Sequence, residues 1–365
     1  MKATPTTVAA RRSALALLQA LACLLSQSAA AEVPALASAT SIRVPRIAGR
    51  LVAADLGLVI NVDDPYSVAV GAYYAQRRGI PAEQIVRVSL PLRNSLSVVE
   101  LDLLAAQIGS ALGPKVQALA LAWARPYAVE CNSITSALSL GFQAALCKQT
   151  CAASAPSAYF NHNTLQPFTD LGLRPSMLLA ASSVEAAQAL IERGIASDQQ
   201  LGKRGVPNAH AVFVSTADAA RSVRSVLFPP AGRFDAAGLE VQRVNGPLPE
   251  LQRVVLLQTG AARVDAIDAI PWLPGALADH LTSFGGKLFE AHGQMTVLDW
   301  LDAGATASYG TVTEPCNHLQ KFPHPQVLLL NYLQGSSAIE AYWRSVAWPA
   351  QGLFVGEPLA APFGH

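Results

Sequence analysis

The sequence predicts an α/β protein built on a mostly parallel sheet with helices on both faces. Short, continuous apolar runs alternate with segments of helical periodicity, which is the pattern of parallel strands linked by crossover helices. The runs lack polar positions, as strands buried on both faces do. Because 51% of the residues are hydrophobic and 14% are charged, the chain can bury a large core and does not have the composition of a disordered protein.

The alternation begins at an apolar run that predicts a buried strand, followed by a helix in which tyrosines and Val70 recur at helical spacing and which ends at Gly79. Ser97 and Glu100 form a capping box in front of the next helix. In chain order, these first elements are a strand at 58–62, a helix at 66–78, a strand at 84–88, a helix at 101–112 and a strand at 116–123.

The same alternation continues to the C-terminus, within one large domain that spans residues 32–365. A capping box of Ser182 and Glu185 predicts a helix that stops at Gly194. Residues 229–249, rich in Pro, Gly and polar residues, predict a surface excursion or a joint between two halves. Further strands are expected at 175–181, 211–214, 254–257, 305–309 and 353–355, and helices at 295–303, 327–332 and 337–346.

Residues 1–31 have the layout of a secretory signal peptide. Arg11 and Arg12 form its positive region, residues 13–26 its apolar stretch, and three alanines its cleavage site. The apolar stretch is shorter than the about 20 residues of a membrane-spanning helix, so we expect an exported protein, periplasmic or extracellular, without an integral membrane segment. The paired arginines leave twin-arginine export open, and Cys23 leaves a lipoprotein open.

Four cysteines remain after the signal: Cys131, Cys147, Cys151 and Cys316. An even number in an exported chain favours disulfides, and four thiols allow three pairings. Cys147 and Cys151 could close a short local loop, which would leave the other two paired across the fold or free. A metal site is the alternative, because the two cysteines have near-ligand spacing, but no nearby histidine completes a zinc pattern.

The formal charge of +1 at pH 7 gives no electrostatic case for binding nucleic acid or an anionic membrane. No cofactor and no metal are expected. The expected partner is a peptide or another ligand of the cell envelope.

Polar residues follow several of the predicted strands, where an open α/β sheet binds its ligands. Asp63 and Asp64 follow the first strand, Arg125 follows the third, and Glu314 follows a late one. Paired acids beside an arginine could perform acid–base chemistry or bind a substrate. The alternative for Asp63 and Asp64 is that they cap the next helix.

Residues 279–286 place an acid, an imidazole, two hydroxyls and a glycine pair close together in the sequence. In the enzymatic interpretation Ser283 is the nucleophile and His280 its base, while Thr282, Gly285 and Gly286 bind the substrate. The alternative is a polar turn whose glycines are required by backbone geometry.

A second catalytic pairing joins His292 to Cys316, as a cysteine peptidase would. In the alternative, His292 is solvated and Cys316 is buried or in a disulfide.

Five stretches resemble an uncharacterised family of exported bacterial proteins: 61–81, 282–286, 304–317, 340–343 and 352–359. That family has no established activity. More distantly, the order of elements is similar to gingipain-type, caspase-like peptidases, and the resemblance implies their three-layer fold.

The peptidase resemblance also implies a change at the catalytic positions. Ser283 stands where these enzymes hold the nucleophilic cysteine, and residues 258–260, Gln-Thr-Gly, stand where they hold the His-Gly of the general base. Two classes of function follow, a hydrolase of peptide or envelope material and a catalytically silent binding protein on the same scaffold.

Overall fold

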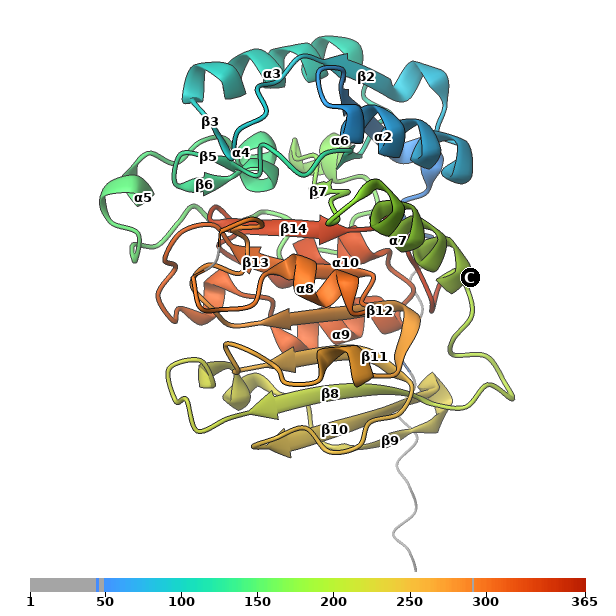
Figure 1. The fold of residues 1–365 in the computed structure, drawn as a ribbon. Helices are drawn as coiled ribbons and strands as arrows, with labels where there is room; N and C mark the ends of the chain where they lie inside the picture. The colour runs from blue at the N-terminus through green and yellow to red at the C-terminus, as the bar shows by residue number, and fades with distance from the viewer. Residues whose placement is uncertain (1–43, 46–48, 291) are drawn as a thin grey trace, which may run out of the picture. The chain divides into compact units, whose positions relative to one another are not determined.

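An eleven-stranded sheet lies at the centre of the protein (Figure 1). The computed structural model describes residues 44–45, 49–290 and 292–365, so residues 1–31, which are predicted to be a signal peptide, and Cys23 with them, lie outside the described residues. In spatial order the strands are β2 (Ile85–Val88), β1 (Leu56–Asn61), β4 (Ala118–Leu121), β7 (Ser176–Leu178), β14 (Gly352–Gly356), β13 (Ala307–Thr311), β12 (Trp272–His280), β11 (Val254–Thr259), β8 (Ala209–Ser215), β10 (Leu239–Asn245) and β9 (Gly232–Phe234).

Most of these strand pairs are parallel, as predicted. The pairs from β2 to β7 are parallel, and so are the pairs from β13 to β10. The pairs β13–β14 and β10–β9 are antiparallel. A separate sheet contains three short strands, β3 (Ser95–Leu96), β5 (Ala128–Val129) and β6 (Asn132–Ser133).

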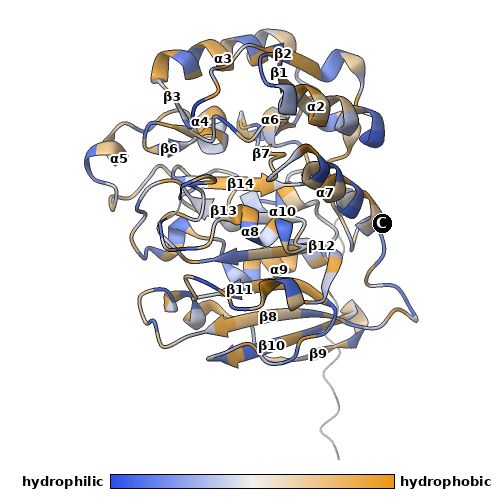
Figure 2. Ribbon diagram, in the orientation of Figure 1, coloured by the Kyte–Doolittle hydropathy of each residue, from blue (hydrophilic) through white to orange (hydrophobic). Residues whose placement is uncertain are grey.

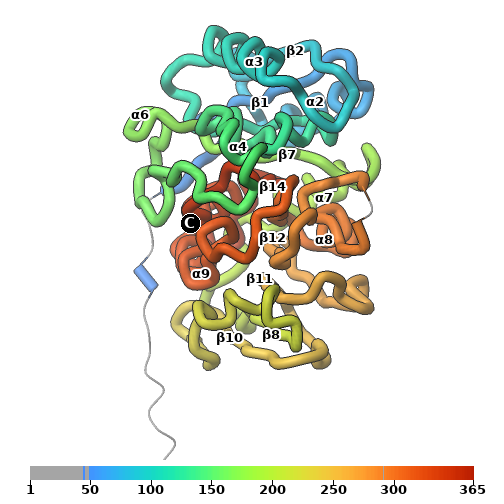
Figure 3. The backbone as a smooth tube through the Cα atoms, turned by 90° about the vertical axis from the view of Figure 1, so that its left-hand side faces the viewer, coloured from blue at the N-terminus to red at the C-terminus, as the bar shows by residue number. Residues whose placement is uncertain are grey.

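Helices cover both faces of the sheet, which confirms the α/β prediction and gives three layers (Figures 1 and 3). One face carries α2 (Pro65–Arg78), α7 (Val184–Ser197) and α8 (Val297–Asp302). The other carries α3 (Val98–Ala111), α4 (Ile134–Leu140), α9 (Pro325–Leu333) and α10 (Ala338–Ser345). Apolar residues concentrate in the strands and on the helix faces that meet them (Figure 2). No helix in the described ranges is long and apolar enough to cross a membrane.

Two groups of strands share one topology. In the first, β1 pairs with β2 on one side and β4 on the other, and β7 follows β4. In the second, β8 pairs with β10 and β11, and β12 follows β11. Each group therefore has a switch point, where consecutive connections leave a strand in opposite directions and the loops separate. The sequence shows no repeat to match this.

The last strand, β14, joins the two groups. It pairs with β13 from Ala307–Gly356 to Thr311–Gly352, and with β7 through Val355 and Leu178. Glu357 follows directly, is fully buried, and forms an ion pair of 2.5 Å with Arg78 at the end of α2.

Several helix boundaries follow the sequence signals. Asp64 caps α2, Gly79 ends it in the left-handed conformation, and the capping box of Ser97 and Glu100 opens α3. The prediction for α7 was wrong at both ends. Its cap is Ser183, whose hydroxyl accepts from the Ala186 N–H (3.1 Å), and the helix continues past Gly194 to Ser197.

Gly194 lies inside α7 because the helix packs closely on another side chain there. A Cβ at this position would lie 2.6 Å from Cγ of Glu357. The glycine is therefore required by packing and not by a helix end.

Residues 229–249 contain β9, β10 and a short 3-10 helix. They form the edge of the sheet beside β8, since β10 pairs with β8 in parallel from Leu239–Ala209 to Asn245–Ser215.

Candidate functional site

The loops that follow strands of both groups meet at one edge of the sheet. Tyr127, after β4, donates its hydroxyl to Glu290, after β12 (2.6 Å), and Asn94 donates to the same carboxylate (3.0 Å). Thr313, after β13, donates to the carbonyl of Cys131 (2.8 Å). The carboxyl edge is therefore a continuous surface of loops.

A pocket of about 300 Å³ lies at this edge between the loops after β8, β12 and β13. We call it the Ser283 pocket. The structure brings four predicted site residues together in its wall: Thr282, Ser283, Glu314 and Cys316. Leu281, Pro315 and Phe322 form its apolar part, and Arg221 and Asn317 complete the polar lining.

Besides the buried Thr282 hydroxyl and Nε of Arg221, three side-chain donors in this lining have no partner in the described part of the chain. These are the Ser283 hydroxyl, the Asn317 side-chain amide and Nη2 of Arg221, whose Nη1 forms an ion pair of 2.5 Å with Asp218. All three can donate a hydrogen bond. Glu314 is held by its own loop, because its Oε1 accepts from the Cys316 N–H (2.8 Å).

Cys316 is in a disulfide with Cys151, and Cys131 is joined to Cys147, with Cα–Cα distances of 5.3 and 5.2 Å. The prediction of disulfides is confirmed, and of the pairings that the sequence left open, the local one between Cys147 and Cys151 is not formed. Cys147 lies in the short helix α5 (Ala145–Lys148), and Cys151 lies in the turn beyond it. Cys147 is therefore within bonding distance of Cys131, and Cys151 within bonding distance of Cys316.

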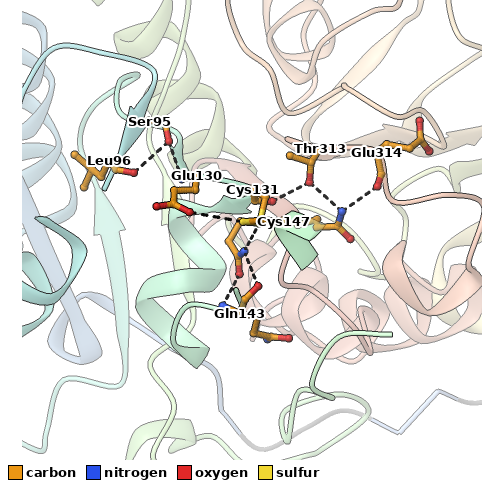
Figure 4. Close-up of a disulfide and its surroundings, with 10 residues drawn as sticks. Ser95, Leu96, Glu130, Cys131, Gln143, Cys147, Thr313 and Glu314 are labelled. Carbon is orange, nitrogen blue, oxygen red and sulfur yellow. Dashed lines mark hydrogen bonds between the residues drawn. A yellow bond between two sulfur atoms is a disulfide. The ribbon is translucent and has the colours of Figure 1, made fainter. Parts of the chain in front are cut away.

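The Cys131–Cys147 disulfide lies beside Thr313, which precedes the pocket residue Glu314 and donates to the Cys131 carbonyl. Figure 4 shows Cys131 and Cys147 beside Thr313 and Glu314. Gln351 donates to the Thr313 hydroxyl (2.9 Å) and to the Glu314 carbonyl (3.0 Å). Both disulfides thus support the segment 313–316, and their presence indicates that the protein matures in a non-reducing, exported environment.

His280 is not a catalytic base, which corrects the prediction for this residue. It is the last residue of β12, it is buried, and both ring nitrogens are occupied. Nε2 lies 2.9 Å from the Met295 carbonyl, and Nδ1 accepts from the Trp300 indole N–H (2.8 Å). Burial lowers the pKa of His280 to about 4, so the imidazole stays neutral and structural.

This lowered pKa predicts a pH dependence of stability. Unfolded His280 binds a proton near pH 6.5, whereas the folded residue does so only near pH 4. Its contribution to stability is therefore complete above about pH 6.5 and is lost as the pH falls towards 4. Urea unfolding between pH 7 and 4 should show a smaller pH slope for His280→Gln than for the native chain. The exposed control His318→Gln should keep the native slope, and equal slopes for all three proteins would contradict the prediction.

His292 does not pair with Cys316. Its Nε2 lies 3.1 Å from Glu290, and its ring packs on Phe284 with centroids 4.8 Å apart. Glu290 also accepts from Tyr127 and Lys287, and these hydrogen bonds lower its pKa to about 2. The predicted dyad is wrong because its thiol is in a disulfide and its imidazole is bound to a carboxylate.

The glycine pair is required by close packing, a reason that neither interpretation of residues 279–286 gave. A Cβ on Gly286 would lie 2.7 Å from the Gly310 carbonyl oxygen, and one on Gly310 would lie 2.6 Å from the Gly286 nitrogen. Gly286 donates its N–H to the Thr311 carbonyl (2.9 Å), and the Gly285 carbonyl accepts from Val297 (2.8 Å). The loop after β12 therefore lies directly on β13, and the glycine pair forms this contact instead of an oxyanion pocket.

Thr282 is buried in the same loop. Its hydroxyl has no partner among the described residues, and its carbonyl accepts from the Thr311 hydroxyl (3.0 Å). Thr282 supports the wall of the Ser283 pocket but presents no accessible oxygen to it.

The other predicted site residues lie outside the pocket lining. Asp64 accepts from the Tyr66 N–H (3.0 Å) as the cap of α2, and Asp63 accepts from the Ser89 hydroxyl. Arg125 donates to Asn94 (2.9 Å) and lies 3.6 Å above the ring of Phe289. These residues belong to the loops of the first strand group and do not form one cluster with Ser283 and Glu314.

Sequence reasoning missed a buried ion pair between Arg224 and Asp279. Arg224, in the 3-10 helix Val223–Leu227, is 2% exposed, and its Nη1 lies 2.6 Å from the carboxylate of the fully buried Asp279. Gln258 donates to the other oxygen of that carboxylate (2.9 Å). The guanidinium also lies 5.9 Å from the ring centroid of Phe322, which lines the Ser283 pocket.

Comparisons of this chain with known protein families, curated proteins and solved structures find no match. The assignment of a function therefore depends on the site itself.

Proposed function

We propose that the protein is an exported, catalytically silent binding protein that holds a peptide or another envelope ligand in the Ser283 pocket. The Cys151–Cys316 disulfide carries the proposal, because it removes the thiol of the cysteine that lines the pocket with Ser283. The two candidate histidines are bound elsewhere, His280 to Trp300 and His292 to Glu290. A serine nucleophile needs an adjacent base, and no described imidazole lines the pocket with Ser283.

The resemblance to gingipain-type peptidases supports the same function. In those enzymes the catalytic histidine and cysteine follow neighbouring strands. Here Gly260 and Ser283 follow β11 and β12, which pair in parallel up to Thr259 and His280. Thr259 accepts from the Ala261 N–H (3.0 Å), so the position that corresponds to the base carries a hydroxyl committed to its own turn.

The free groups of the pocket favour a ligand with a carboxylate. Arg221, Ser283 and Asn317 all have donors without a partner in the described ranges, and Nη2 of Arg221 can bind a second carboxylate while Nη1 stays paired with Asp218. Glu314 also lines the pocket, and its Oε1 is bound within its own loop. A carboxylate accepts several hydrogen bonds at once and pairs well with arginine. The C-terminus of a peptide, or of a stem peptide from the cell envelope, has this chemistry.

A binding experiment on the mature chain tests the proposal. Calorimetry would compare N-acetyl-Ala-Ala-Ala with its C-terminal amide, and with soluble fragments of digested peptidoglycan. We expect the acid to bind at least tenfold more tightly than the amide. Arg221→Gln should weaken binding of the acid by roughly tenfold to a hundredfold, the range for a lost hydrogen bond to a charged group.

The matched control is Arg233→Gln. Arg233 lies in β9, the outermost strand of the sheet, and its side chain is 69% exposed. This substitution should leave binding unchanged. The proposal would be contradicted if neither the tripeptide acid nor the peptidoglycan fragments bound. Turnover of either probe that disappears in Ser283→Ala would also overturn it and would instead support a hydrolase.

A further inference from the structure

A second pocket lies at the switch point between β8 and β11. It has a volume of about 370 Å³. Crevices at switch points are where open α/β sheets bind small molecules, and typical ligand pockets begin at about 300 Å³. Because Arg263 stands at its opening, we call it the Arg263 pocket.

The interior of the Arg263 pocket is apolar. Val214, Leu248 and Val264 line it, and all three belong to or pack against the hydrophobic cluster around Trp300. Thr259 lines the pocket as well, but its hydroxyl is bound within its own turn. The interior therefore offers contact to an apolar group and few hydrogen bonds.

Two charged residues of opposite sign line the exposed part of the pocket. Arg263 and Asp265 line the pocket on either side of Val264, both are exposed, and neither has a hydrogen bond or ion pair within the described residues. The turn that carries them is anchored, since the Val264 N–H donates to the Met295 sulfur (3.0 Å) and Met295 donates to the Ala262 carbonyl (3.0 Å). A cation and an anion are thus held beside one apolar cavity.

We infer that the Arg263 pocket binds a free α-amino acid with an apolar side chain. The ligand carboxylate pairs with Arg263, its ammonium group pairs with Asp265, and its side chain enters the apolar interior. The pocket volume of about 370 Å³ lies at the lower end of the range for small-molecule pockets, which leaves room for a ligand as small as leucine.

This site is separate from the Ser283 pocket. The turn of residues 216–222 lies between the two linings and is closed by hydrogen bonds from Thr216 N–H to the Ser222 hydroxyl (2.8 Å) and from Ser222 N–H to the Asp218 carbonyl (2.9 Å). Thr216 lines the Arg263 pocket and Arg221 lines the other. Binding at one site therefore does not depend on the proposed function of the other.

Calorimetry with L-leucine, N-acetyl-L-leucine and L-leucinamide tests the inference, because the two derivatives each lack one charge. We expect leucine to bind and each derivative to bind at least tenfold more weakly. Arg263→Gln and Asp265→Asn should each weaken leucine binding by roughly tenfold.

The Ser283-pocket variant Arg221→Gln should leave leucine binding unchanged, so the two proposals fail separately. Equal affinity for leucine and both derivatives would overturn the inference, as would the absence of leucine binding. Loss of leucine binding in Arg221→Gln would indicate that leucine binds in the Ser283 pocket, and this would also overturn the inference.

Discussion

Gly310→Ala is expected to lower the free energy of unfolding by more than about 3 kcal/mol, at the upper end of the cost of overpacking. A Cβ at this position would lie 2.6 Å from the Gly286 nitrogen and 2.9 Å from the Gly285 carbonyl oxygen. Backbone atoms cannot rotate away as the end of a side chain can, so the loop after β12 must separate from β13. Urea unfolding measures the effect, and ligand binding in the Ser283 pocket should weaken with it.

The matched control is Gly109→Ala. Gly109 lies on the exposed side of α3, and a Cβ there would meet no atom within 4 Å. This substitution should stabilise the protein by about 0.5–1 kcal/mol, because alanine favours the helix. A Gly310→Ala protein as stable as the native chain would show that the loop does not pack on β13 in this way.

Arg224→Met should cost about 3–5 kcal/mol of stability, the range for a buried ion pair that loses one partner. Asp279 is fully buried and would retain a carboxylate whose only remaining side-chain donor is Gln258 (2.9 Å) among the described residues. Burial already raises the pKa of Asp279, and Arg224 is the charge that opposes this shift. Chemical unfolding at pH 7 measures the loss.

Two further variants separate the ion pair from simple packing. Arg233→Met removes an exposed pair whose side chains are 69% and 63% exposed, and it should change stability by less than about 1 kcal/mol. The double variant Arg224→Met, Asp279→Leu should recover most of the loss, because it leaves no unpaired buried charge. No recovery would mean that the arginine stabilises the fold through its other contacts.

Local sequence patterns correctly predicted several helices and strands. They failed where contacts with residues far away in the chain determine the structure. Continuous apolar runs correctly located β1, β4 and β11, and the capping box at Ser97 correctly opened α3. The end of β12 was mistaken for a polar turn, because Asp279 and His280 are polar residues inside a buried strand.

The partners of these two residues explain the error. Asp279 pairs with Arg224 and His280 with Trp300, which are 55 and 20 positions away in the chain. Because these partners are distant in the chain, no local sequence pattern shows that Asp279 and His280 belong to a buried strand.

The candidate site was predicted in part. Glu314 was nominated by the rule for parallel sheets and Ser283 by the residue types around it, and the two do line one pocket. Arg221 and Asn317 carried no motif and were missed, although they follow β8 and β13, and the same rule expects ligand-binding residues after such strands. The disulfide partners could not be deduced, since four cysteines allow three pairings without a stated geometry.

The position of β14 has a consequence for biogenesis. This strand occupies the middle of the sheet but consists of residues 352–356, which the ribosome adds after every other described strand of that sheet. A nascent chain without them holds two incomplete half-sheets, with β7 and β13 exposing unpaired backbone along their inner edges. Open edges of this kind attract other strands, so a chaperone that shields them until export is finished would keep the immature protein from aggregating.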